Sequence, residues 1–236
     1  MNNPYQESEE VSVQAAAPNL IQRVIAVFAS PTQLGERLRQ NSPWFVTLSI
    51  VALVSVVMML ITPAELIREA AEAQMAAQGR EGAPLSTALI RAFGIGGIIV
   101  VSFGGAALVA GVLYLIFNVI FGQSDTTYRQ HLSAVAHVFW ISLLGGLILF
   151  PLQVSKGYLE MRLGLGLLLP DEPSSLLGYF LTNVTIFGLW AAASLGAVET
   201  GLSGGRVSAG KSAGTILVLY LLFAGVMAVF PTIRGG

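Results

Sequence analysis

The sequence contains no cysteine and few charged residues. Without cysteine it has no disulfide, no thiolate nucleophile and no sulfur ligand for a metal. Charged side chains make up 11% of its 236 residues, whereas they make up about a quarter of an ordinary soluble domain. Basic residues are not in excess, because 12 Lys and Arg stand against 13 Asp and Glu. These shortages exclude an ordinary soluble enzyme, and they disfavour a protein that binds the phosphate backbone of a nucleic acid.

The charges that are present avoid five long segments. These segments lie between Arg39 and Glu65, Arg91 and Asp125, Arg129 and Lys156, Glu172 and Glu199, and Lys211 and Arg234. About 20 apolar helical residues cross the hydrocarbon of a bilayer, where an ionised side chain is costly. A barrel would need strands of about ten residues with alternating polarity, a pattern that these runs lack. The sequence predicts an all-α, polytopic membrane bundle in contact with lipid, whose membrane domain (42–233) has spans at 43–61, 92–121, 132–154, 176–198 and 213–232.

The residues before the first span fall into two parts. Residues 1–19 form a polar tail that we expect to be disordered, and they lack the basic and apolar segments of a secretory signal peptide. Residues 20–41 predict amphipathic helices, because apolar residues recur at helical spacing in Leu20, Ile21, Val24, Ile25 and Phe28 and again in Leu34 and Leu38. Two interpretations stay open for these helices. They lie in the membrane interface, or they pack on the loops of the bundle.

Few polar side chains are expected inside the spans. The spans contain no Asp, Glu, Lys or Arg between their boundary charges, which disfavours a proton relay or ion-coupled transport. Asn118, His137 and Asn183 are expected to form hydrogen bonds with neighbouring helices. His131 and His137 do not share a face, since six residues turn a helix by about 240°. We predict no catalytic, metal-binding or cofactor-binding residue.

A row of small residues marks one face of the expected fourth span. Gly188, Ala192 and Gly196 are four residues apart, so their face of the helix lacks bulk. Small residues at this spacing allow the backbones of two helices to approach closely. The row predicts helix packing, either inside the bundle or between two copies of the chain.

Two stretches carry a family resemblance. They are FASPTQLGERLRQNSPWF, from Phe28 to Phe45, and FGQSDTTYRQHLSAVAH, from Phe121 to His137. Together with five spans and an N-terminal interfacial helix, they resemble the prokaryotic branch of the Yip-one domain family over about residues 20–231. The resemblance implies a helical bundle in the prokaryotic inner membrane, with a cytoplasmic N-terminus and no known catalytic centre. The long N-terminal region and the Asp-Leu-Tyr-Gly-Pro motif of the eukaryotic branch are missing, so a Rab-type GTPase is not expected as a partner.

The orientation is predicted only indirectly. With five spans, six Lys and Arg fall on each side of the membrane, so their count does not orient the chain. A cytoplasmic N-terminus is expected because no export signal precedes the first span.

Two functions are compatible with this pattern. The first is a non-enzymatic membrane protein that organises the membrane or binds partners, including a second copy of itself. The alternative is a small transporter or channel in which Asn118, His137 and Asn183 line a neutral polar path.

Overall fold

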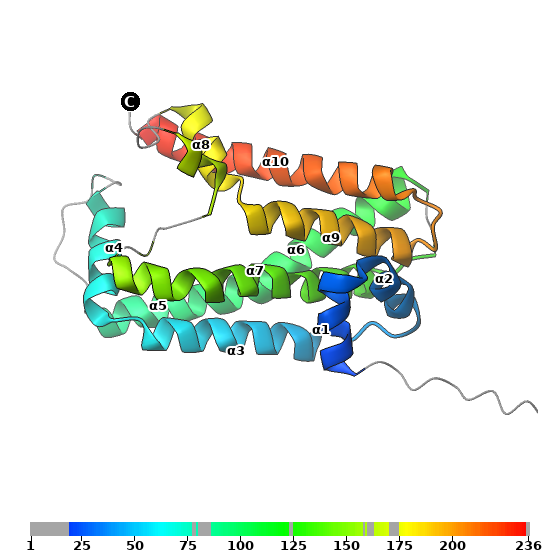
Figure 1. Cartoon of the computed structure of the whole chain (residues 1–236), viewed down its shortest axis with the longest axis horizontal. Helices are drawn as coiled ribbons and strands as arrows, with labels where there is room; N and C mark the ends of the chain where they lie inside the picture. The colour runs from blue at the N-terminus through cyan, green and yellow to red at the C-terminus, as the bar shows by residue number, and fades with distance from the viewer. Residues whose placement is uncertain are drawn as a thin grey trace, which may run out of the picture.

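The computed structural model describes residues 19–76, 79, 86–122, 125–157, 159, 163–169 and 175–234, with the side chains of residues 232 and 234 left aside. Most helices lie along one long axis, and α1 and α4 run across it near opposite ends (Figure 1). The elements are α1 (Leu20–Ala29), α2 (Pro31–Gln40), α3 (Phe45–Ile61), α4 (Ala64–Ala76), α5 (Thr87–Ile99), the π-helical η1 (Val100–Gly105), α6 (Ala106–Tyr114), the π-helical η2 (Leu115–Ile120), α7 (Tyr128–Lys156), the short 3-10 helix η3 (Leu165–Leu168), α8 (Leu176–Asn183), α9 (Ile186–Leu202) and α10 (Ala209–Arg234). The tail expected over residues 1–19 lies outside the described residues, apart from Asn19.

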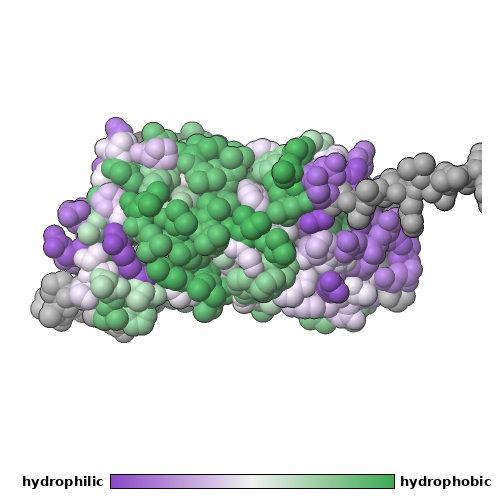
Figure 2. All heavy atoms as spheres, turned by 90° about the horizontal axis from the view of Figure 1, so that it is seen from below, coloured by the Kyte–Doolittle hydropathy of each residue, from purple (hydrophilic) through white to green (hydrophobic). Residues whose placement is uncertain are grey.

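Several helices are long and apolar enough to cross a membrane. Among the described residues they are Thr87–Ile120, Tyr128–Lys156 and Ala209–Pro231, and α3 with α4 passes the same test as a pair bent by 99°. Figure 2 shows hydrophobic residues gathered over the middle of the molecule, with hydrophilic residues toward both ends. This distribution confirms the expected fold class, a membrane bundle of helices, and leaves the number of spans at three or four by length and composition.

The bend between α3 and α4 follows from the Thr62-Pro63 sequence. Thr62 has an extended backbone, and Pro63 has no N–H to continue the hydrogen bonds of a helix. The free carbonyl of Thr62 instead accepts a hydrogen bond of 2.7 Å from Nη2 of Arg91, at the start of α5. The first span therefore stops here, and α4 turns away from the bundle.

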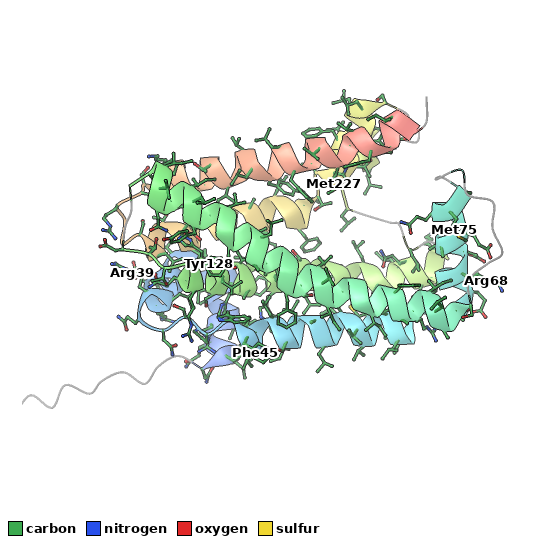
Figure 3. All side chains as sticks on the ribbon, turned by 180° about the vertical axis from the view of Figure 1, so that it is seen from behind. Arg39, Phe45, Arg68, Met75, Tyr128 and Met227 are labelled. Atoms are coloured by element: carbon green, nitrogen blue, oxygen red, sulfur yellow. The ribbon has the colours of Figure 1, made fainter. Side chains whose placement is uncertain are left out.

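The second span is one long helix with two π-helical segments. Its 34 residues, Thr87–Ile120, measure about 51 Å at 1.5 Å per residue, well above the roughly 30 Å of a hydrocarbon core. It crosses the bundle diagonally (Figure 3), which is the tilt that such a length requires.

The fourth span expected at 176–198 is not one continuous helix. It is divided at Val184, which ends α8, while Thr185 caps α9 through a hydrogen bond from the Gly188 N–H to its hydroxyl. Two backbone hydrogen bonds with residues 163 and 165 fill the break: Leu165 N–H donates to the Val184 carbonyl at 2.9 Å, and Ile186 N–H donates to the Leu163 carbonyl at 3.0 Å. Backbone groups freed by a break need such partners wherever water is excluded.

Helix α2 packs directly on α9. A Cβ on Gly35 would lie 2.9 Å from the backbone nitrogen of Leu202, a separation that real side chains essentially never show. Leu34 and Leu38 are fully buried, so they face the bundle and not lipid. Helix α2 is therefore packed on the bundle through this face.

One side of helix α1 packs against the bundle, and the other side is exposed. Ala26 and Val27 are buried, and the Phe28 ring meets the Trp190 ring edge to face at 5.5 Å between centroids. Ile21 and Ile25 are 69% and 58% exposed. The exposed isoleucines give α1 an apolar face that no other described element covers.

Candidate functional site: a polar network between η2, α7 and α9

A completely buried histidine, His131, lies at the centre of a polar network. Its Nδ1 is 3.0 Å from Oε1 and 2.9 Å from Oε2 of Glu199, a carboxylate that is itself only 1% exposed. On the other side of the ring, Nε2 is 3.1 Å from Nδ2 of Asn118 and 3.2 Å from Oγ1 of Thr126. The Thr126 hydroxyl donates to Oδ1 of Asn118 at 2.7 Å. Three helices, η2, α7 and α9, therefore meet through polar side chains.

Local sequence explains why His131 points inward. Thr127 and Gln130 form a reciprocal cap, in which each side chain accepts a hydrogen bond from the backbone N–H of the other. The cap fixes the first turn of α7 and places His131 on it, opposite α9. On the η2 side, Asn118 is held by a second hydrogen bond, from its amide nitrogen to the Tyr114 carbonyl at 3.2 Å.

The donors and acceptors of the network assign its protons. The amide nitrogen of Asn118 can only donate, so Nε2 of His131 accepts, and the proton of the ring lies on Nδ1, where it is donated to Glu199. A single chain of hydrogen bonds then runs from Thr126 through Asn118 and His131 to the Glu199 carboxylate. A buried network of this kind is favourable when its members are paired, and loss of one partner leaves another polar group stranded.

Two surface contacts join the loops at the same end of the bundle. Nη1 of Arg206 lies 2.6 Å from Oδ2 of Asp125, in a pair that is about half exposed. Nζ of Lys211 lies 3.7 Å from the centre of the Phe121 ring. The first contact joins the η2–α7 connection to the α9–α10 connection, and the second joins the residue after η2 to the first turn of α10.

This end of the bundle also holds the N-terminal helices. In Figure 3, Arg39 and Tyr128 lie at one end of the molecule, and Arg68 and Met75 lie at the other. Burial lowers the pKa of Arg23, on α1, below its usual value, and the guanidinium still stays protonated at neutral pH.

His137 lies on a different face of α7 from His131. It is completely buried, its Nδ1 is 2.7 Å from the Ser133 carbonyl, and its Nε2 is 3.5 Å from the Thr47 hydroxyl on α3. The Ser133 hydroxyl donates to the Pro43 carbonyl at 2.9 Å, just before α3 begins. These contacts place His137 in the packing between α3 and α7.

Asn183 lies at the break between α8 and α9. Its carbonyl accepts a hydrogen bond of 3.0 Å from the Tyr220 hydroxyl, and the same hydroxyl accepts one of 2.9 Å from the Thr185 N–H. One side chain of α10 thus pairs two backbone groups that the interrupted helix leaves free. Asn183 belongs to α8 and Asn118 to η2, and the hydrogen bonds described for Asn118 are with Tyr114, Thr126 and His131.

The row of small residues lies inside the bundle, between α9 and α10. A Cβ on Gly196 would lie 2.9 Å from the backbone nitrogen of Ala213, and one on Gly188 would collide with the Tyr220 hydroxyl. Ala192, between them, is 5% exposed. The close approach of backbones at this row is therefore made within one chain.

The importance of Glu199 and His131 is not apparent from the charge pattern. Glu199 was expected only as the charge that ends the fourth span, yet it lies within α9 and is buried. A local signal exists: Leu195, Glu199 and Leu202 are four and three residues apart, so they share one face of the helix, and all three are buried. An acid on an apolar face predicts a buried partner, which here is His131 on α7.

The described residues hold no group of three or more His, Asp or Glu side chains that could bind a metal.

A family model for the Yip1 domain matches residues 25–231, which is most of the chain and includes the whole network. The chain belongs to the Yip1 domain family. This Yip1 domain is an integral membrane bundle, in agreement with its apolar helices. No curated protein and no solved structure shows a significant match.

Proposed function

We propose that this Yip1-domain protein is a non-enzymatic scaffold that organises the membrane, with α1 and α2 as its working part. The observation that carries the proposal is that α2 packs tightly on the bundle while the adjoining α1 exposes apolar side chains. Gly35 and Gly201 bring α2 into backbone contact with α9, while Ile21 and Ile25 of α1 stay exposed.

The position of α1 supports insertion into one leaflet. It runs across the long axis near one end of the bundle, so it lies roughly parallel to a membrane that the long helices cross (Figure 1). Phe45 and Val46, at the start of α3, are exposed by 60% and 56% and extend the apolar surface there. An amphipathic helix buried at the boundary between headgroups and acyl chains binds in a way that depends on membrane curvature.

The polar network supports the same role by holding α9 in place beneath α2. The hydrogen bonds of His131 and Glu199 tie α9 to α7, and those of Asn118 tie η2 to both. A rigid base of this kind would transmit to the whole bundle any force that the membrane exerts on α1. A second copy or another membrane protein is the partner that we expect at this scaffold.

The proposal includes a topology of five crossings. In this topology α8 and α9 together form a fourth crossing with a break at Val184. The Tyr220 hydroxyl and the backbone near Leu165 form hydrogen bonds with the backbone groups that the break leaves free. The N-terminus is cytoplasmic, and the membrane is the inner membrane of a prokaryotic cell.

Reconstitution into vesicles tests the scaffold role. Vesicles of phosphatidylcholine and phosphatidylglycerol containing the protein should have smaller diameters in electron cryomicroscopy than protein-free vesicles made alike. The double variant Ile21→Asn with Ile25→Asn should abolish the effect, and the control Gln33→Ala, at an exposed position of α2, should keep it. Equal diameters with and without the wild-type protein would contradict the proposal.

A transporter is the second candidate, and the buried Glu199 is the observation that favours it. Ionisable groups within a membrane often mark ion or proton pathways. The scaffold proposal expects no flux of protons or small solutes through reconstituted vesicles, and no change in Glu199→Gln or Asn118→Leu. Flux that either substitution abolishes would establish the transporter instead.

A further inference from the structure

A cavity that is open to the surface of the bundle lies between α3, η1 and α7, at half the depth of the bundle. Its volume is about 410 Å³, and its apolar lining includes Val51, Met58 and Phe139. Three serines from the three elements also line it: Ser55, Ser102 and Ser142. Each lies near the middle of its membrane helix, so the cavity is far from both membrane surfaces.

Two of the three serine hydroxyls have no partner in the part of the chain that the structure describes. Ser55 follows the usual pattern of a helical serine, since its hydroxyl donates to the carbonyl of Val51, four residues earlier, at 2.9 Å. Ser102 is only 8% exposed, whereas Ser142 is exposed at the surface, and no side-chain hydrogen bond of either serine occurs among the described residues. A hydroxyl that faces an apolar cavity without a partner is unfavourable, because lipid does not form hydrogen bonds.

The backbone around Ser102 is unusual as well. Ser102 belongs to η1, the first of the two π-helical segments of the second span, and Asn118 belongs to the second, η2. Short π-helical segments within α-helices are frequent at functional sites. Since η2 presents Asn118 to the polar network, η1 presents Ser102 to the cavity in a parallel way.

The lining restricts the chemistry of a ligand. Charged side chains are absent from the lining, so an ionised ligand would have no countercharge in the hydrocarbon. The ester groups of phospholipids lie near the membrane surface, about 15 Å from the centre of a core that is roughly 30 Å thick. An apolar cavity of about 150 Å³ is enough to hold benzene. The cavity here, at about 410 Å³, can therefore hold a ring together with part of a chain.

We propose that this cavity binds a neutral, membrane-soluble ligand whose carbonyl oxygen accepts hydrogen bonds from the Ser102 and Ser142 hydroxyls. The apolar chain of the ligand leaves the cavity past Val101, which lines it and is 66% exposed. A prenylated quinone has this chemistry, with carbonyl oxygens on a ring and an apolar tail. The site is separate from α1 and α2, so it does not depend on the scaffold proposal.

An alkylated benzophenone is a suitable probe, because it is a neutral ketone that reacts on irradiation with nearby C–H bonds, those of methionine above all. Met58 lines the cavity, and Met227, on α10, is 40% exposed and reports labelling from the lipid (Figure 3). The protein is irradiated with the probe in nanodiscs, and the adducts are quantified by peptide mass spectrometry. Met58 should be labelled severalfold more than Met227.

Substitutions then test the hydroxyls. Ser102→Ala with Ser142→Ala should lower the ratio of Met58 to Met227 labelling by about tenfold, in line with the loss of two neutral hydrogen bonds. Ser55→Ala is the matched control and should leave the ratio unchanged, since the Ser55 hydroxyl already has a backbone partner. An unchanged ratio in the double variant would mean that acyl chains alone fill the cavity and would overturn the proposal.

Competition gives a readout that needs no variant. An unlabelled decyl-benzoquinone should protect Met58 from the probe, whereas decylbenzene, which has no carbonyl, should not. Equal protection by both compounds, or labelling of Met58 no stronger than that of Met227, would also overturn the proposal.

Discussion

Gly35 and Gly201 meet where α2 crosses α9, so closely that a Cβ on Gly201 would lie 3.0 Å from the Cα of Gly35. At this distance two helices are in direct backbone contact, and only glycine fits on either side. The contact makes α2 a part of the bundle and leaves the adjoining α1 to meet the membrane. The fixation of α2 therefore depends on two residues without side chains.

Substitution at this crossing should separate α2 from α9. Gly201→Leu inserts a side chain against backbone atoms that cannot move aside, and overpacking of a core commonly costs about 1–3 kcal/mol. We expect a lower midpoint of thermal unfolding, measured in detergent by circular dichroism. Gly210→Leu is the control, because a Cβ at Gly210 would meet no atom within 4 Å. An equal midpoint for both variants would show that the crossing is looser than described.

The two acid–base pairs at this end of the bundle should differ greatly in strength. His131 and Glu199 are 0% and 1% exposed, whereas Arg206 and Asp125 are 43% and 55% exposed. Removal of the Glu199 carboxylate leaves the Nδ1–H of His131 buried without a partner, which costs about 1–3 kcal/mol. An exposed pair contributes about 0–1 kcal/mol. We therefore expect Glu199→Ala to lower the free energy of unfolding far more than Asp125→Ala.

A double substitution checks the reason for this difference. His131→Leu with Glu199→Leu removes both polar groups, so it should be less destabilising than Glu199→Ala alone. The free energies come from denaturant titrations in mixed micelles. The free energy of unfolding lost in the double variant is compared with the losses in His131→Leu alone and in Glu199→Leu alone. A loss equal to the sum of these two would show that the side chains act independently.

The hydroxyl of Tyr220 should stabilise the break between α8 and α9. Tyr220→Phe removes the partner of both the Asn183 carbonyl and the Thr185 N–H. A buried polar group left without a partner costs about 1–3 kcal/mol, so a clear loss of thermal stability is expected. Tyr179→Phe serves as the control, as no hydrogen bond of its hydroxyl occurs among the described residues. The interpretation fails if both variants melt at the wild-type temperature.

Single cysteines can test the five crossings, because the native chain has none. Gln40→Cys and Gln74→Cys lie before and after the first span, and Lys156→Cys and Gly210→Cys lie before and after α8 and α9. If α8 and α9 together cross the membrane, an impermeant thiol reagent should label Gly210→Cys with Gln40→Cys, and Lys156→Cys with Gln74→Cys. Labelling of Lys156→Cys and Gly210→Cys from the same side would remove the fourth crossing.

The membrane helices could be predicted from sequence because hydrocarbon excludes charge, and the exclusion is visible along the chain. The end of the first span at Thr62-Pro63 is also a local signal. The break at Val184 is different, because the groups that pair with its free backbone atoms are distant in sequence. They are the backbone of Leu163 and Leu165 and the hydroxyl of Tyr220. Thr185 is a typical N-cap residue, but a cap alone does not show that a helix is interrupted.

The polar network was missed for a similar reason. Asn118 was expected to bond to a neighbouring helix, but its partners His131 and Thr126 could not be identified without the fold. Glu199 follows the last apolar residues of the span, where a charge normally reaches water. The fold buries it against His131 of α7, across 68 positions of sequence.

The depth of α1 in the membrane tests the central claim most directly. Spin labels on Ile25→Cys and, as the control, on Gln33→Cys of the protein in vesicles report collisions with oxygen, which concentrates in hydrocarbon, and with a water-soluble nickel complex. We predict that the label at position 25 collides mainly with oxygen and the label at position 33 mainly with nickel. Equal access of the nickel complex to both positions would place α1 in water and contradict the account.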